Sequence, residues 1–403
     1  MNIELMRKVD YYVGIPMCFV LTFFNRLISL FNRPKIKKVK KVLFIELSEM
    51  GSTILTYSAF RKVKQLYPYS SIYFLIFKKN RVSIDVMNII PKQNVLTIDS
   101  SSLSNLVKDC IKLFFLFRRL KFDLSYDLEL FSRFTAILSF FTLAKQRVGF
   151  SNNVNEGLYR GDIFTKKVWY NPYIHISGNF LNLVYSVESN PKDKIQYKNK
   201  IDDADIFSLK LKYSKLQTKK IKDYFSSKFG IDTDIKTILV NADGGLLPIR
   251  AWPIDNYIVL LKNLCYHPCN IVLTGVGKSA EKTANIILSK FEENKIINLT
   301  NKTSFQQLID LFHISDALIT NDGGPAHFAT LTDIKIFTFF GPETPVLYAP
   351  LSEDATNFYA NYACSPCLTA YNHRKTMCKE QKCLKAISVD YVYNTIKKVL
   401  KWR

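Results

Sequence analysis

Short apolar runs rich in β-branched and aromatic residues alternate with longer helical patterns along most of this chain of 403 residues. The short runs predict buried strands, and the longer patterns predict helices. In the first half we expect strands at 42–46, 72–77, 95–98, 122–128 and 146–150, with helices at 53–66, 103–120 and 133–143. In the second half we expect strands at 237–241, 270–274, 296–299, 317–320 and 334–340, with helices at 254–264, 280–291, 304–312 and 387–401. Strands separated by helices indicate an α/β protein whose parallel sheets are covered by helices on both faces.

The chain is too long for one ordinary hydrophobic core, so we expect the alternation to fill two domains. Residues 189–235 are polar and rich in lysine, with few strand signals, and we place the link between the domains in their second half. The predicted division is an N-terminal hydrophobic and basic segment at 1–40, one α/β domain at 41–215 and a second α/β domain at 216–403.

The N-terminal segment combines an apolar run with a cluster of cations. Residues 11–24 are nearly all apolar, and a basic cluster follows at Arg33, Lys35, Lys37, Lys38, Lys40 and Lys41. Asn25 and Arg26 interrupt the apolar run, which is shorter than the ~20 residues that a spanning helix needs. No cleavage pattern of a signal peptide follows it. We expect a helix at the cytoplasmic surface of a membrane, with its cations against anionic headgroups. The alternative is a helix packed on the protein's own domain.

The formal net charge is +22, and most of the surplus is lysine spread along the chain. Nucleic acid, an anionic membrane and an anionic substrate are the partner classes that such a charge allows. The sequence contains no zinc-finger spacing, no aromatic RNA-binding motif and no recognition-helix signature. We therefore expect a membrane surface and an anionic small molecule as partners, and no nucleic acid.

The most informative stretch is a turn between a predicted strand and a predicted helix. It reads Asn321-Asp322-Gly323-Gly324-Pro325-Ala326-His327. A helix that opens at such a turn leaves backbone N–H groups without intrahelical partners, and these groups attract anions such as phosphate. The glycines let the backbone approach a ligand, and the proline is tolerated in a first helical turn. Asp322 and His327 could bind a sugar or a phosphate by hydrogen bonds.

This turn and the strand end that follows it resemble the C-terminal signature of glycosyltransferase family 9, the heptosyltransferases of lipopolysaccharide core assembly. In that family an Asp-x-Gly-x-x-His turn precedes a helix, and the next strand ends in Phe-Gly-Pro-Thr-x-Pro. Here the second motif reads Phe340-Gly341-Pro342-Glu343-Thr344-Pro345. The resemblance implies two Rossmann-like domains with parallel sheets facing a cleft, the GT-B arrangement. It also implies a nucleotide-sugar donor bound by the second domain.

The first predicted strand ends in a turn that is similar to the family's Met-Gly-Asp turn, whose Asp is the general base. Here the turn reads Met50-Gly51-Ser52, so a serine occupies the position of the base. A serine hydroxyl does not ionise near pH 7 and cannot take this role. We predict that Glu49 is the base, because a turn residue is more exposed to a ligand than the strand-ending Glu46. The alternatives for Glu49 are a solvated loop charge and a helix-capping acid.

Further donor-binding residues follow from the resemblance. Arg250 matches the cation that the family places on the donor phosphates, and its guanidinium can hold two phosphate oxygens. Gly275 ends a strand similar to the family's nucleoside-contact strand. Glu281 in the next helix either bonds a ribose hydroxyl or is an acid that stabilises the start of that helix. Thr303 precedes another helix at which Ser304 is either a nucleotide contact or a plain N-cap.

The sequence predicts no catalytic metal and no cofactor. No Asp-x-Asp pair stands at a strand end, since Asp232 and Asp234 lie before the second half. Cys364, Cys367, Cys378 and Cys383 form a C-x2-C and a C-x4-C pair, which is a weak signal for structural zinc. The other four cysteines are expected to be buried as small hydrophobic residues.

Together these features predict an inverting, metal-independent glycosyltransferase. The resemblance implies that it moves a sugar such as heptose from an ADP-linked donor to a glycolipid such as the lipopolysaccharide core. Lys78, Lys79 and Arg81 could attract an anionic acceptor. Two alternatives stay open: a nucleotide-sugar epimerase, and a scaffold that binds the sugar nucleotide without turnover because Ser52 replaces the family's acid.

Overall fold

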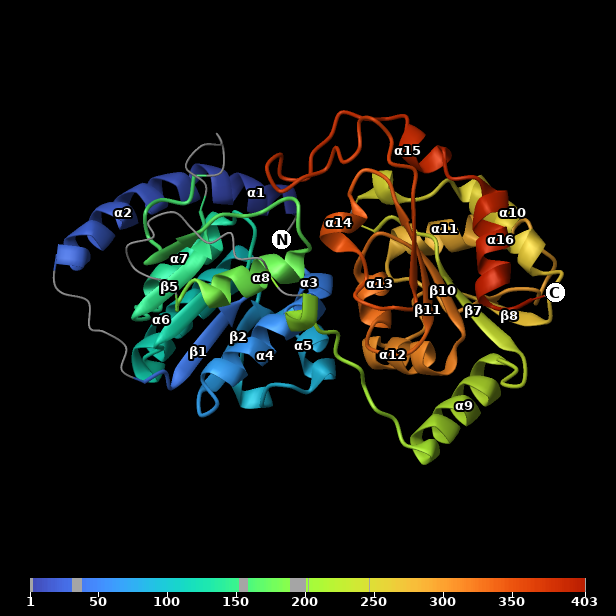
Figure 1. Ribbon diagram of the computed structural model, residues 1–403, viewed down its shortest axis with the longest axis horizontal. Coiled ribbons are helices and arrows are strands. Elements are labelled where there is room, and N and C mark those ends of the chain that lie inside the picture. Colours follow the sequence, from blue (N-terminus) through green and yellow to red (C-terminus); the bar gives the residue numbers. More distant parts are fainter. Residues whose placement is uncertain are drawn as a thin grey trace. The chain divides into compact units, whose positions relative to one another are not determined.

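The computed structural model describes residues 3–30, 38–151, 159–188, 201, 203–245 and 247–402. The chain divides into two compact units, Met1–Phe207 and Ser208–Arg403. Each unit contains its own parallel sheet of six strands with helices around it (Figure 1). The prediction of an α/β fold with two parallel sheets is therefore confirmed. The division follows Phe207 rather than residue 215, and the N-terminal segment belongs to the first unit instead of standing apart.

The first unit has the strand order β3-β2-β1-β4-β5-β6, with every neighbouring pair parallel. The strands are β1 (Lys41–Ile45), β2 (Ser71–Phe77), β3 (Val95–Ile98), β4 (Leu124–Asp127), β5 (Gln146–Phe150) and β6 (Lys166–Val168). The helices of its α/β part are α3 (Met50–Leu55), α4 (Tyr57–Leu66), α5 (Val82–Met87), α6 (Leu103–Leu120), α7 (Arg133–Phe141) and α8 (Ile176–Tyr185).

The side chains of β1 alternate between the two faces of this sheet, as a buried strand requires. Leu43 and Ile45 belong to the hydrophobic cluster that contains Phe117 of α6. Phe44 points to the other face, where its ring lies 4.6 Å from the ring of Phe60 in α4. Both faces of the central strand are therefore dry, which explains the continuous apolar run in the sequence.

The N-terminal helices α1 (Ile3–Tyr12) and α2 (Gly14–Leu30) pack on α7. Residues Leu5–Leu30 form a helical stretch that is long and apolar enough to cross a membrane by length and composition, which is longer than the uninterrupted apolar run suggested. Polar contacts fix both helices to the unit: Asp10 pairs with Arg133 at 3.2 Å, and Arg147 donates to the Asn25 side chain at 2.7 Å. Of the predicted basic cluster, Arg33, Lys35 and Lys37 lie outside the described residues.

The second unit has the strand order β12-β11-β10-β7-β8-β9, again fully parallel. The strands are β7 (Lys236–Asn241), β8 (Cys269–Leu273), β9 (Ile297–Asn298), β10 (Ala317–Asn321), β11 (Lys335–Phe340) and β12 (Ala355–Tyr359). The helices are α9 (Lys215–Phe229), α10 (Ile254–Leu264), α11 (Lys278–Leu288), α12 (Phe305–Ile314), α13 (Gly324–Ala329), α14 (Pro345–Tyr348), α15 (Lys382–Lys385) and α16 (Val389–Val399).

In both sheets the strand order reverses direction at one place. In the first unit the reversal lies between β1 and β4, and in the second it lies between β7 and β10. Parallel sheets bind ligands beyond the carboxyl ends of the strands at such a reversal. The sequence predicts that the turns at 46–53, 241–252 and 320–327 bind ligands, and these turns lie at the carboxyl ends of β1, β7 and β10.

Candidate active site

The turn after β1 places Glu49 at the start of α3. Glu49 has the extended backbone of an N-cap residue, but its side chain caps no backbone N–H group of the helix. Its carboxylate instead accepts a hydrogen bond from the Ser52 hydroxyl at 2.9 Å. Glu46 is buried at the strand end, whereas Glu49 is partly exposed. The choice of Glu49 over Glu46 as the residue open to a ligand agrees with this geometry, while its role as a base stays a prediction.

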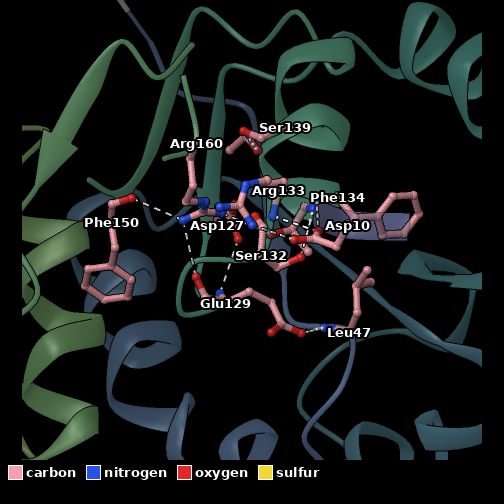
Figure 2. A network of polar contacts seen from close by, with 12 residues as sticks. Asp10, Leu47, Asp127, Glu129, Ser132, Arg133, Phe134, Ser139, Phe150 and Arg160 are labelled. Carbon is pink, nitrogen blue, oxygen red and sulfur yellow. Dashed lines mark hydrogen bonds and ion pairs between the residues drawn. The ribbon is translucent and has the colours of Figure 1, made fainter. Parts of the chain in front are cut away.

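Residues from two other strand ends hold this turn in place. Glu129, in the loop after β4, accepts from the backbone N–H groups of Leu47 and Ser48 at 2.9 and 2.8 Å, and from the Ser48 hydroxyl. Figure 2 shows the contact of Glu129 with Leu47. From the side of β2, Asn80 donates to the carbonyl groups of Leu47 and Ser48 at 2.9 and 3.0 Å. Both the N–H groups and the carbonyl groups of Leu47 and Ser48, directly before Glu49, are therefore held by side-chain hydrogen bonds.

Several carboxyl groups crowd this end of the sheet. Burial raises the pKa of Glu46 well above its usual range, and the carboxylates of Glu129 and Glu49 add to the effect. Burial also raises the pKa of Glu129. Asp127, at the end of β4, is fully buried and pairs with the guanidinium of Arg160 (Figure 2). Burial raises the pKa of Asp127 to about 7, although Arg160 acts in the opposite direction.

In the second unit, Arg250 and Asp322 come together from the loops after β7 and β10. The Arg250 Nε lies 3.6 Å from the Asp322 Oδ2, and both side chains are nearly buried. Asn321 fixes the two loops to each other. Its side chain donates to the carbonyl groups of Ala242 and Asp243 at 3.0 and 3.2 Å and accepts from the Trp252 N–H at 2.9 Å. The sequence analysis gave Asn321 no role, although it is the first residue of the turn that contains Asp322.

Two further charged side chains, which the sequence analysis missed, complete this group. Glu343 follows β11 and is 1% exposed, and its Oε1 lies 2.8 Å from Nη2 of Arg250. The same oxygen lies 3.4 Å from Nε of Arg374. The sequence could have indicated Glu343, because this glutamate replaces the threonine of the family's Phe-Gly-Pro-Thr motif. Arg374 lies in the cysteine-rich tail and gave no signal of its own.

The glycine turn itself differs in part from the expectation. Gly323 has an extended backbone, with φ of 170°, which any residue can adopt. The helix α13 that Gly324 opens has only six residues, with Pro325 in its first turn and His327 buried in its last turn. A macrodipole grows with helix length, so this helix offers an anion less than the sequence suggested. The guanidiniums of Arg250 and Arg374 supply positive charge close to this turn.

Comparison with known proteins supplies the family. The sequence model of glycosyltransferase family 9 (heptosyltransferase) matches residues 116–377. The chain belongs to glycosyltransferase family 9. Lipooligosaccharide heptosyltransferase 2 of Haemophilus ducreyi is 24% identical over 326 residues, which cover 78% of this chain and 87% of that protein. The enzyme of the same name from Campylobacter jejuni (serotype O:6) is 32% identical over 132 residues, a match that spans 40% of that protein and 32% of this chain.

Solved structures of the family share the fold. The ADP-heptose lipopolysaccharide heptosyltransferase II of Escherichia coli aligns with a TM-score of 0.68 at 19% identity, covering 89% of this chain and 98% of that one. A family 9 glycosyl transferase from Veillonella parvula gives a TM-score of 0.69 at 19% identity, with 91% and 98% covered. At this identity the likeness shows the family 9 fold.

The residues expected to contact the nucleoside show mixed outcomes. Gly275 has φ of +155°, and a Cβ atom there would lie 2.7 Å from the Cβ of Ala280, so the strand end requires glycine. Glu281 is exposed in the first turn of α11. Ser304 forms a capping box with Gln307 at the start of α12, which identifies it as an N-cap. Thr303 is half-buried directly before this cap. No contact in the described residues joins Glu281 or Thr303 to Arg250.

The cysteine-rich tail shows no metal centre. Among the described residues, no three His, Cys, Asp or Glu side chains are placed to hold a metal ion. Cys364 and Cys378 are exposed thiols, whereas Cys383 is buried. The zinc hypothesis therefore has no support from the geometry. Of the four cysteines expected in the core, only Cys18 is fully buried, and the other three are half-buried.

Two of the three basic residues proposed to attract an anionic acceptor form ion pairs within the protein. Lys78 lies 3.5 Å from Asp99, and Arg81 lies 3.0 Å from Asp85. Lys79 is exposed beside them. Because ion pairs neutralise two of the three cations, their attraction for an anion is weaker than the sequence suggested.

Proposed function

We propose that this family 9 chain is an inverting glycosyltransferase that moves heptose from an ADP-linked donor to a glycolipid of the lipopolysaccharide-core type. The observation that carries the proposal is the Arg250–Asp322 pair at the strand reversal of the second unit. A guanidinium there can neutralise the departing diphosphate, and the neighbouring carboxylate can hold sugar hydroxyls and orient the anomeric carbon. The names of the heptosyltransferase relatives support the choice of sugar.

The acceptor chemistry belongs to the first unit in this proposal. Glu49 takes the proton of the acceptor hydroxyl as that oxygen attacks the face opposite the leaving group, which inverts the anomeric configuration. The Ser52 hydroxyl orients the Glu49 carboxylate, and Glu129 and Asn80 fix the turn that carries it.

The proposed reaction needs no divalent cation or other cofactor. In its place the guanidinium of Arg250 meets the charge on the leaving group. Transfer measured in the presence of EDTA tests this point. We expect the rate to be unchanged, and a rate abolished by EDTA and restored by Mg²⁺ or Mn²⁺ would show that a metal takes part.

Transfer from ADP-heptose to a lipopolysaccharide-core acceptor tests the two assigned residues. Arg250→Ala is expected to lower kcat/KM by about 100-fold or more, the usual cost of removing a preorganised charge-stabilising group. Glu49→Gln keeps the shape of the side chain and is expected to lower kcat by about 100-fold or more. Lys262→Ala, which removes an exposed cation from the adjacent α10, is the matched control.

Each outcome has a definite meaning. Full activity of Arg250→Ala would contradict the phosphate assignment, and full activity of Glu49→Gln would exclude Glu49 as the base. If the unaltered chain binds the donor but transfers no sugar, the scaffold interpretation is correct. Turnover of the sugar nucleotide to an epimer without acceptor would identify an epimerase. Thermal shifts with a panel of nucleotide sugars identify the donor, because a ligand of the folded state raises the melting temperature.

We also propose that the enzyme attaches peripherally to the cytoplasmic surface of the inner membrane through α2. Phe19 and Phe23 are 70% and 60% exposed on this helix. The contacts of Asn25 with Arg147 and with the Asp162 carbonyl hold the helix on the unit, which favours a flat position at the interface over a span. Phe19→Ser with Phe23→Ser should abolish sedimentation with anionic vesicles. Unchanged sedimentation would show that α2 does not bind the bilayer.

A further inference from the structure

The cysteine-rich tail, residues 364–383, places the guanidinium of Arg374 beside Glu343 in the candidate donor site. The tail runs back past the end of β11, where the N–H groups of Cys367 and Leu368 both donate to the Pro342 carbonyl at 2.9 Å. The Ser365 hydroxyl donates to the Gly341 carbonyl in the same place. These bonds tie the tail to the residues directly before Glu343, so the placement of Arg374 follows from the main-chain structure of the tail.

Arg374 itself is held by Glu343 and Tyr348. Its Nε lies 3.4 Å from the Glu343 Oε1. Its Nη2 donates to the Tyr348 hydroxyl at 3.3 Å, and its guanidinium lies 5.4 Å from the centre of the Tyr348 ring. Its side chain is 20% exposed, so this guanidinium is oriented but still accessible to a ligand.

Arg250 and Arg374 share one carboxylate oxygen. Two cations this close repel each other unless a carboxylate lies between them, and Glu343 supplies that charge from a fully buried position. A guanidinium forms paired, charge-assisted hydrogen bonds with phosphate oxygens. Two guanidiniums preassembled at one strand end match a ligand with two adjacent phosphate groups, and their fixed positions lower the entropy cost of binding.

We propose that Arg374 is a second donor-binding residue, which together with Arg250 holds the diphosphate of the nucleotide sugar. The inference rests on the proposed function, since it assigns the ligand of the same site. It gives the tail a role in substrate binding that does not depend on a metal. The competing interpretation is that the Arg374–Glu343 pair only fastens the tail to the second unit.

Calorimetric titration of the full chain with ADP, UDP and GDP separates these interpretations. For the nucleoside diphosphate that binds the unaltered protein, Arg374→Ala is expected to weaken the affinity by about 10-fold or more, the cost of one charge-assisted hydrogen bond. Arg374→Lys keeps the charge without the planar fork and should give an intermediate affinity. Lys375→Ala removes the exposed cation next in the chain and should bind like the unaltered protein.

A second measurement distinguishes the loss of a phosphate contact from a general disturbance of the site in Arg374→Ala. The affinity for the corresponding nucleoside, which carries no phosphate, is measured by NMR titration, and Arg374→Ala should leave it unchanged. Equal affinity of Arg374→Ala and the unaltered protein for the diphosphate would overturn the inference while the proposed function stands. Equal losses for nucleoside and diphosphate would also overturn it, because a displaced tail would explain them. If the unaltered protein binds no nucleoside diphosphate, the proposed function fails, and the assignment of Arg374 fails with it.

Discussion

Replacement of Arg160 by methionine tests the buried ion pair beneath the candidate acceptor turn. Arg160 is 2% exposed and its partner Asp127 is 0% exposed (Figure 2). The guanidinium also donates to the Thr135 hydroxyl and the Phe150 carbonyl, each at 3.1 Å. Methionine fills similar space but leaves the Asp127 carboxyl and these acceptors without the guanidinium. Breaking a buried pair in this way costs about 3–5 kcal/mol of unfolding free energy.

The destabilisation should depend on pH. The pKa of Asp127 is already raised to about 7 by burial, and loss of Arg160 raises this pKa further. A carboxyl whose pKa is raised on folding contributes stability at low pH that is lost as pH rises through the folded-state pKa. Below about pH 6 the carboxyl is protonated in both proteins, so the pH-dependent part of the difference vanishes there. Above about pH 7 the difference should grow by up to about 1.4 kcal/mol per pH unit, until the variant's own pKa is reached.

Hydrogen exchange measured by mass spectrometry at several urea concentrations resolves the two units. Peptides from β4 and β5 should lose protection in Arg160→Met, while peptides from β10 and β11 serve as an internal control. Lys145→Met is the matched variant, because it removes the half-exposed partner of Asp123 on the same sheet and should cost less than about 1 kcal/mol. A loss in Arg160→Met no greater than in Lys145→Met, or a loss that is the same at pH 6 and pH 8.5, would refute the reasoning.

Three shorter predictions concern single contacts. Asn25→Leu removes the side-chain oxygen that accepts from the buried Arg147 at 2.7 Å and should cost about 2 kcal/mol in urea unfolding; an unchanged midpoint would contradict the docking of α2. Ser304→Ala removes an N-cap and should cost about 1 kcal/mol with no change in nucleotide affinity, and weaker binding would give the residue a ligand role. Gly275→Ala forces a Cβ atom to within 2.7 Å of Ala280, so both the melting temperature and its rise with ADP should fall; an unaltered melting curve would show that this strand end relaxes freely.

The sequence predicted the two sheets well because each central strand is buried on both faces. Runs such as 42–46 and 317–320 are continuous apolar segments, and only a covered parallel sheet uses such strands in alternation with helices. The helix expected at 53–66 is divided at Thr56 into α3 and α4. Helix α9 was missed because it buries only Phe225 and therefore lacks an apolar stripe, although Ser214 and Gln217 form a capping box at its start. Strand β6 has three residues and two of them are lysine, so it gives no strand pattern.

The candidate site was predictable only where local sequence carries the chemistry. Turns at strand ends are local features, so the sequence could propose Glu49 and Asp322 from their turns and Arg250 from its match to the family, and their roles stay predictions. Glu129 and Arg374 act through contacts with residues far away in the chain, namely Ser48 and Glu343. Contacts of this kind depend on which distant segments become neighbours in the fold, and neither hydrophobic periodicity nor a turn pattern predicts those neighbours. A charged residue at a strand end next to the reversal of strand order is the feature that could have indicated Glu129.

The exchange of the family's acidic residue for Ser52 is consistent with catalysis once the hydrogen bond of that serine is considered. Ser52 occupies the first turn of α3, and its hydroxyl donates to the carboxylate of Glu49, which directly precedes that helix. The family has a carboxyl group at the position of Ser52. Here the carboxyl group of Glu49 lies within hydrogen-bond distance of the Ser52 hydroxyl and can take its place. The hydroxyl of Ser52 donates a hydrogen bond that fixes the rotamer of Glu49. It adds no second negative charge to a turn that already lies close to the carboxyl groups of Glu46 and Glu129. An aspartate at position 52 would place two carboxylates in contact, whereas the serine donates a hydrogen bond to the one carboxylate that is there.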